Sequence, residues 1–143
     1  MYAALRAIPI PDDVVARLFH AASLLREHRG DGHVAALVIE GVGGLEAHVL
    51  LALDMGMPAE KFGRIHHLPA AQRAAVIDGM RDRGLIGDDG WLSEQGRAVK
   101  QRVEALTDDL AAKPYERLQP AELDELMATL EPMATRLLAA QAW

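Results

Sequence analysis

Residues 69–102, PAAQRAAVIDGMRDRGLIGDDGWLSEQGRAVKQR, decide the fold because they combine a helix, a stop, a tight turn and a second helix. The first part of this stretch repeats apolar residues at helical spacing, and Gly84 follows it as a favourable helix C-terminus. Apolar pairs then flank the turn-forming run Gly-Asp-Asp-Gly, so residues 85–92 predict a short β-hairpin. Ser93 is a favourable N-cap, which predicts a helix from Glu94 onward.

Two motifs at the ends of this hairpin resemble a known family. Arg83-Gly84-Leu85 and residues 92–97, LSEQGR, resemble the second half of the winged helix-turn-helix of MarR-like proteins. In those proteins a recognition helix ends in Arg-Gly-Leu, a β-wing follows, and Leu-Thr-x-x-Gly-Arg opens the next helix; here Ser93 stands for the threonine. The resemblance implies a mainly α fold with a small β-wing. If the family resemblance is set aside, the same pattern indicates a helix–hairpin–helix in a small α+β domain.

A second resemblance extends over nearly the whole chain. The runs LREHRGDGHVAAL (residues 25–37) and GGLEAHVL (residues 43–50) look like a bacterial family of MarR-like helix-turn-helix proteins without an assigned activity. Members of that family are often about twice as long, and this chain resembles their C-terminal half, beginning at Tyr2. The resemblance implies that the N-terminal half is absent or that a second copy of this chain replaces it.

Composition indicates a helical protein with one domain, or one domain plus arms. The chain has 143 residues, 50% of them hydrophobic but only 4% aromatic, so small and aliphatic side chains supply the core. The absence of cysteine excludes disulfides, thiol catalysis and cysteine zinc sites. No apolar run approaches the roughly 20 residues of a membrane helix, and the first residues lack a signal-peptide pattern. We therefore expect a cytoplasmic protein without a membrane partner.

The chain divides into three segments by pattern and charge. Residues 1–56 form an N-terminal arm with helices, residues 57–97 the helix-turn-helix and wing, and residues 98–143 the long C-terminal helices. Apolar spacing and helix breakers predict helices at residues 12–29, 33–40, 45–55, 59–65, 69–83 and 94–112, and a last one from 120 with a kink at Pro132. In MarR-like proteins the terminal helices build a two-fold dimer, so the resemblance implies a homodimer. Alternatively, the last helix packs only on its own core.

The candidate DNA-binding residues lie in the least acidic segment. The net charge is −6, but residues 57–102 hold eight Lys or Arg against six Asp or Glu. The residues that would approach double-stranded DNA are Lys61, Arg64, His66, His67, Gln72, Arg73 and Arg81. The predicted outward face of the recognition helix is poor in base-reading groups, since it carries Ala70, Ala71, Ala74 and Asp78. Asp88 and Asp89 place negative charge at the wing tip, where MarR-like wings usually offer arginine.

A polar run between two predicted helices supplies the candidate ligand site. Gly30-Asp31-Gly32 is expected to break the helix, leaving two arginines near one helix end and the start of the next helix close by. A small anionic ligand would then contact Arg26, His28, Arg29, Asp31 and His33. MarR-like proteins commonly bind such ligands. The structural alternative is that Asp31 caps the next helix while the charged side chains pair with one another.

No pattern in the chain indicates catalysis, a cofactor or a metal. The nucleophile-elbow, phosphate-loop and dinucleotide-binding glycine motifs are all missing, and no histidine pair has the H-E-x-x-H spacing. We therefore expect a protein that is not an enzyme. The sequence leaves open two functions: a DNA-binding, ligand-responsive transcriptional regulator, or a degenerate winged helix that no longer binds DNA and serves as a ligand-binding or protein-interaction module.

Overall fold

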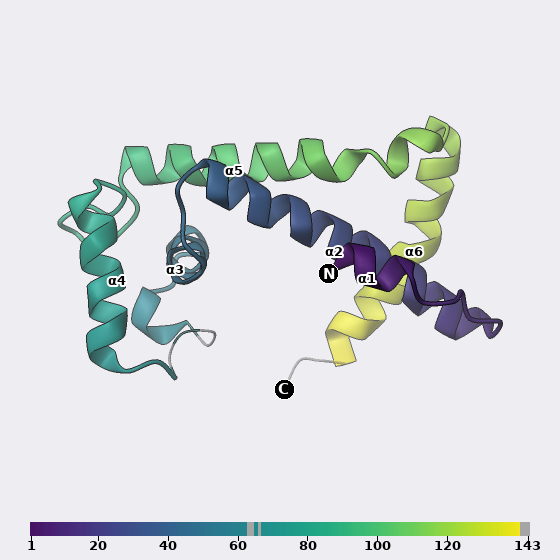
Figure 1. Ribbon diagram of the computed structural model, residues 1–143, viewed down its shortest axis with the longest axis horizontal. Coiled ribbons are helices and arrows are strands. Elements are labelled where there is room, and N and C mark those ends of the chain that lie inside the picture. The colour runs from purple at the N-terminus through teal and green to yellow at the C-terminus, as the bar shows by residue number, and fades with distance from the viewer. Residues whose placement is uncertain (63–64, 66, 141–143) are drawn as a thin grey trace. The chain divides into compact units, whose positions relative to one another are not determined.

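The protein is mainly helical in its computed structural model, which describes residues 1–62, 65 and 67–140. Six α-helices and two single 3-10 turns follow one another along these residues (Figure 1). The elements are α1 (Tyr2–Arg6), α2 (Val14–Ile39), α3 (Gly44–Asp54), η1 (Ala59–Lys61), α4 (Ala70–Asp82), α5 (Glu94–Ala112), η2 (Tyr115–Arg117) and α6 (Pro120–Ala140). The chain forms two compact units, residues 1–111 and residues 112–143.

Helix α2 corrects the prediction that the chain breaks at Gly30-Asp31-Gly32. The helix runs without interruption from Val14 to Ile39, so the two helices expected on either side of the glycines are one. A glycine ends a helix when it adopts a left-handed conformation, and the glycine that does so here is Gly41, whose φ is +65°. Gly32 instead allows close packing, because a Cβ at this position would lie 3.1 Å from the Cβ of Leu110 on α5.

The core of the first unit is built around α3. Val49, Leu50 and Ala52 on this helix are at most 1% exposed. They belong to one apolar cluster with Met80 of α4 and Val103 of α5. Helix α3 begins after Gly43, whose N–H donates to the Glu46 carboxylate at 2.8 Å. The buried side of α3 therefore forms one core with residues of α4 and α5.

The predicted β-wing is not seen. Among the described residues no strand forms between α4 and α5, and a single antiparallel bridge joins Ile86 to Leu92. The Gly87 N–H donates to the Trp91 carbonyl at 2.9 Å, which closes a tight turn. A longer ladder has no room, because Gly84 ends α4 with a φ of +71° just before it and α5 begins just after it.

The start of α5 is fixed by Ser93, as predicted. The Ser93 hydroxyl accepts the Gly96 N–H at 3.0 Å and donates to the Gly84 carbonyl at 2.5 Å. The Ser93 N–H also donates to the Leu85 carbonyl at 3.0 Å. One side chain therefore caps α5 and ties its first turn to the end of α4.

The short helix expected over residues 59–65 is also wrong in its extent. Only Ala59–Lys61 forms a 3-10 turn, and residues 63 and 64 lie outside the described part of the chain. Pro58 precedes this turn and Phe62 follows it in extended conformation, which limits it to three residues. The connection between α3 and α4 thus contains one tight turn rather than a full helix among the residues that can be described.

The second unit consists mainly of α6. This helix continues through Pro132 and has no buried residue in its described length, so its apolar stripe is uncovered within the unit. Met127, Met133 and Leu137 are 62%, 47% and 65% exposed. The expected kink at Pro132 stays a prediction.

Hydropathy gives one further result for the described residues. None of the helices alone has both the length and the apolar composition needed to cross a membrane. Helices α2 and α3 meet these criteria only as a pair, bent by 98° where they join.

Candidate functional site

The exposed face of α4 is small and weakly polar. The helix begins after Pro69, buries Met80 against the core and leaves Ala70, Ala71 and Ala74 exposed. Asp78, one turn further on, is also exposed and carries negative charge. The predicted outward face is therefore confirmed by burial, and it offers few hydrogen-bonding groups to a base edge.

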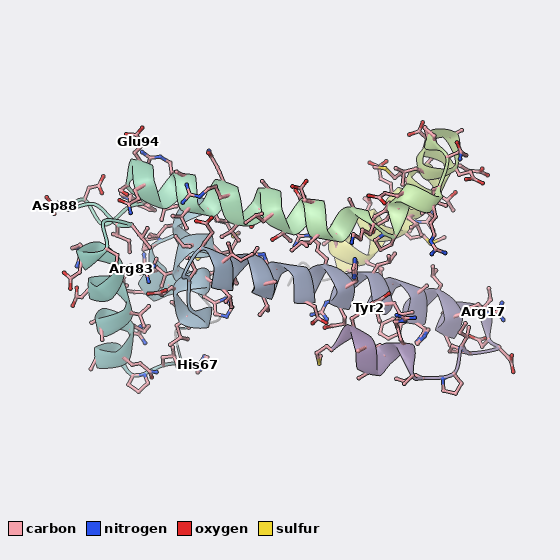
Figure 2. All side chains as sticks on the ribbon, turned by 45° about the horizontal axis from the view of Figure 1, so that its top comes forward. Tyr2, Arg17, His67, Arg83, Asp88 and Glu94 are labelled. Atoms are coloured by element: carbon pink, nitrogen blue, oxygen red, sulfur yellow. The ribbon has the colours of Figure 1, made fainter. Side chains whose placement is uncertain are left out.

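Most arginines around α4 bind the protein itself. The Arg73 guanidinium donates to the Leu68 carbonyl, and Arg81 pairs with Asp78 at 2.7 Å. Arg83 lies between α4 and α3 and donates to the Gly41 carbonyl at 3.0 Å (Figure 2). Each of these bonds would compete with a phosphate for the same guanidinium, so α4 offers less available positive charge than the sequence indicates.

The other predicted DNA contacts lie near the start of α4. Lys61, His67 and Gln72 are exposed, and Lys61 makes no ion pair with a described residue. Arg64 and His66 lie outside the described residues. Lys61 is thus an exposed cation in the segment that precedes α4.

The turn between α4 and α5 carries negative charge, as the sequence indicated. Asp88 lies at its outer end and is exposed (Figure 2). Asp89 accepts the Trp91 N–H at 3.0 Å through its carboxylate, so it stabilises the turn. Neither side chain attracts a phosphate, and this turn therefore lacks the positive tip expected of a DNA-contacting wing.

The predicted ligand corner does not form, because α2 is continuous and its residues point in different directions. Arg26 pairs with its neighbour Glu27. His28 lies against the Tyr2 ring of α1, with ring centroids 5.0 Å apart, and Asp31 accepts the N-terminal ammonium at 3.3 Å. His28 and Asp31 thus hold α1 on α2, whereas Arg26 pairs within α2, so the three side chains do not face one common site.

Arg29 and His33 instead face α5, which runs alongside α2 (Figures 1 and 2). Arg29 donates to Glu104 at 3.2 Å and to Asp108 at 3.4 Å. His33 Nδ1 lies 3.0 Å from the hydroxyl of Thr107, which is fully buried. The structure therefore keeps these two predicted ligand residues together and separates them from Arg26, His28 and Asp31.

Arg29 and His33 line a cavity of about 600 Å³ between α2, α3 and α5. Its polar wall also includes His48, Lys100 and Glu104, and its apolar wall includes Leu37, Leu50, Leu51 and Val103. The residues of α3 and α5 in this lining were not predicted from the sequence. A lone threonine within the apolar stripe of α5, and the Lys100–Glu104 pair one turn apart, were the available signals.

The electrostatics of the polar wall follow from burial and from ion pairs. Burial lowers the pKa of His33, although the charge of Glu104 opposes this effect. Burial alone would raise the pKa of Glu104, but the hydrogen bond from Lys100 and the charge of Lys100 lower it below its ordinary value. At neutral pH this wall therefore presents a neutral imidazole beside an ionised carboxylate that is shared by two cations.

No metal-binding cluster is present in the described part of the chain. Nowhere among these residues do three His, Asp or Glu side chains come close enough to hold an ion.

Comparison with known protein families gives a match that covers the whole chain. A helix-turn-helix family model matches residues 1–143. The chain belongs to this helix-turn-helix family. The match supports the general helix-turn-helix assignment and does not specify the MarR-like type. No curated protein and no solved structure matches the chain.

Proposed function

We propose that the protein binds duplex DNA through α4 and acts as a transcriptional regulator. The observation that carries this proposal is the family match over residues 1–143, combined with an α4 whose outer face is exposed. A recognition helix inserts into the major groove, and a face of Ala70, Ala71 and Ala74 lets the helix approach the bases closely.

In the binding mode that we propose, contacts to the DNA phosphate backbone outweigh contacts to the bases. Alanine contacts a thymine methyl but forms no hydrogen bond, so this face specifies little sequence. In this proposal Lys61, His67 and Arg81 would contact phosphates, while Asp78 would repel them. Each phosphate neutralised by a cation contributes about −0.9 to the slope of log affinity against log salt. We therefore expect weak sequence preference and strong salt dependence.

The decisive experiment uses the Asp78–Arg81 pair. Asp78→Asn removes a negative charge and releases Arg81, so affinity for a labelled duplex should rise and the salt slope should steepen by about one unit. Arg81→Ala should weaken binding, whereas Arg117→Ala in the second unit is the matched control. Fluorescence anisotropy over a salt series measures all four proteins. If Asp78→Asn leaves the affinity unchanged, α4 does not lie on the DNA.

We also propose that the protein is a MarR-like homodimer. Two apolar surfaces support this: Val15 and Phe19 on α2 are 70% and 75% exposed, and Met133 and Leu137 on α6 are 47% and 65% exposed. A second copy would cover these surfaces and double the number of α4 helices available to DNA. Sedimentation velocity should show a dimer that Leu137→Glu converts to monomer, with Thr129→Glu on α6 as control. A wild-type monomer at micromolar concentration would contradict this.

The alternative function is a non-catalytic interaction module that has lost DNA binding. Its specific support is that Arg73, Arg81 and Arg83 all bind groups of the protein itself. The same anisotropy titration discriminates the two functions, because this alternative predicts no complex with duplex DNA even at low salt. In either case, we propose that a small ligand in the cavity between α2, α3 and α5 modulates the protein.

A further inference from the structure

A second cavity lies where α3, η1, α4 and the turn before α5 meet. Its volume is about 230 Å³, which is below the roughly 300–1,000 Å³ of typical ligand pockets, so it suits a small molecule. Its apolar lining comes from the buried residues Leu53, Ala59 and Ile86, together with Ile77 of α4. All four elements belong to the first compact unit. None of the described residues that line this cavity also lines the one between α2, α3 and α5.

Carboxylates outnumber cations around this cavity. Among the lining residues that the structure describes, Glu60 and Asp89 are acidic and Arg81 is basic. Arg81 pairs with Asp78 at 2.7 Å, so its charge is already shared with a third carboxylate. Glu60 forms no ion pair with any residue in the described part of the chain. The cavity therefore attracts a cation more readily than an anion.

The turn after α4 brings a carboxylate and an indole ring to the same lining. The Trp91 N–H donates to the Asp89 carboxylate at 3.0 Å, and the Trp91 carbonyl accepts the Gly87 N–H at 2.9 Å. These bonds hold Asp89 and Trp91 beside one another, and Trp91 remains 39% exposed. A cation placed over an indole ring is attracted by the negative face of the ring, and tryptophan provides the strongest attraction of this kind.

We propose that this cavity binds a small primary amine with a compact apolar body. The ammonium group lies between Glu60 and Asp89, next to the Trp91 ring, and the apolar body lies against Leu53 and Ile86. Both acids would repel a carboxylate, and a neutral ligand would gain neither the ion pairs nor the cation–π attraction. The inference goes beyond the proposed function. Its binding test contains no DNA, so this site and DNA binding can fail independently.

The experiment compares phenethylamine, which is protonated at pH 7, with 2-phenylethanol and 3-phenylpropionate. The chain has two tryptophans, so a Trp143→Phe background leaves the indole N–H of Trp91 as a single NMR signal. The amine should shift this signal saturably and bind at least about tenfold more tightly than the alcohol or the acid. Equal affinities, tighter binding of the acid, or no saturable shift with the amine would overturn the proposal.

Two neutralising variants locate the ammonium group. Glu60→Gln and Asp89→Asn should each weaken binding of the amine by about threefold, since each removes one of its two counter-charges. Asparagine keeps a side-chain oxygen that can accept the Trp91 N–H, so the turn is retained. Unchanged affinity in both variants would show that the amine does not lie between these carboxylates.

Two further variants separate this cavity from general charge attraction. Arg81→Gln should strengthen binding of the amine several-fold, because it removes a cation from the lining. Asp88→Asn is the matched control, since Asp88 lies at the outer end of the same turn and is not among the described lining residues (Figure 2). It should leave the affinity unchanged. A loss equal to that of Asp89→Asn would mean that overall negative charge attracts the amine, and the assignment of this cavity would be wrong.

Discussion

Replacing Gly96 with alanine should destabilise the protein, although the same change usually stabilises a helix. An ideal Cβ at Gly96 would lie 2.1 Å from the carbonyl oxygen of Leu85 and 3.0 Å from its carbonyl carbon. Both are backbone atoms, so no side chain can rotate away. Relief requires the first turn of α5 to move away from the turn that follows α4, which disrupts the hydrogen bonds of Ser93 to Gly84 and Leu85.

The expected cost is the balance of three terms. Overpacking typically costs about 1–3 kcal/mol. A weakened N-cap adds about 1 kcal/mol. The higher helix propensity of alanine offsets about 0.5–1 kcal/mol of this loss in the free energy of unfolding. We therefore expect Gly96→Ala to lower the free energy of unfolding by about 1–3 kcal/mol, measured as a lower urea midpoint by helical circular dichroism at an unchanged m-value.

Two other glycines on helices provide internal controls for this prediction. Gly30→Ala has nothing within 4 Å of its Cβ and should raise stability by about 0.5–1 kcal/mol. An added Cβ at Gly32 would lie 3.1 Å from the Leu110 Cβ, a contact that a small shift of α5 relieves, so Gly32→Ala should fall between the other two variants. If Gly96→Ala were as stable as Gly30→Ala, the close approach of α5 to the Leu85 carbonyl would be wrong.

Three further outcomes test the same structure by chemical denaturation. Ser93→Ala should cost about 1 kcal/mol through the lost cap, whereas Ser93→Thr keeps the hydroxyl and should stay near wild type. Thr107→Val should cost about 1–3 kcal/mol, because His33 Nδ1 loses its acceptor while the volume is conserved; a neutral effect would refute that bond. Burial lowers the pKa of His33 in the folded state. The contribution of neutral His33 to the free energy of unfolding is therefore present above about pH 6.5 and is lost as pH falls through the folded-state pKa. His33→Gln should flatten the stability profile over that window, and an unchanged profile would show that another group titrates there.

Local rules predicted the boundaries around α4 and α5 correctly because each depends on one or two neighbouring residues. Gly84 ends α4 in the left-handed conformation, and Ser93 caps α5 from the position the motif indicated. The same rules were wrong at Gly30 and Gly32. Glycine is permissive rather than a compulsory stop, and here packing against Leu110 of α5 favours a continuous helix.

The candidate sites show the same division between local and long-range causes. The exposed, alanine-rich face of α4 was predictable, since it follows from helical periodicity and the position of Met80 in the core. That Arg83 binds the Gly41 carbonyl, 42 residues away, was not predictable from spacing. Charge counted along the sequence therefore does not reveal that Arg83 is engaged within the protein.

The sequence by itself determined the helical composition, the stop at Gly84, the cap at Ser93 and the amphipathic face of α4, because these depend on residues within a turn or two of one another. Only the tertiary structure decided which polar groups meet. His33 and Thr107 are 74 residues apart, and Arg29 and Glu104 are 75 apart. Their meeting depends on how α2 and α5 pack over α3, and that packing separates the predicted ligand residues and creates the cavity.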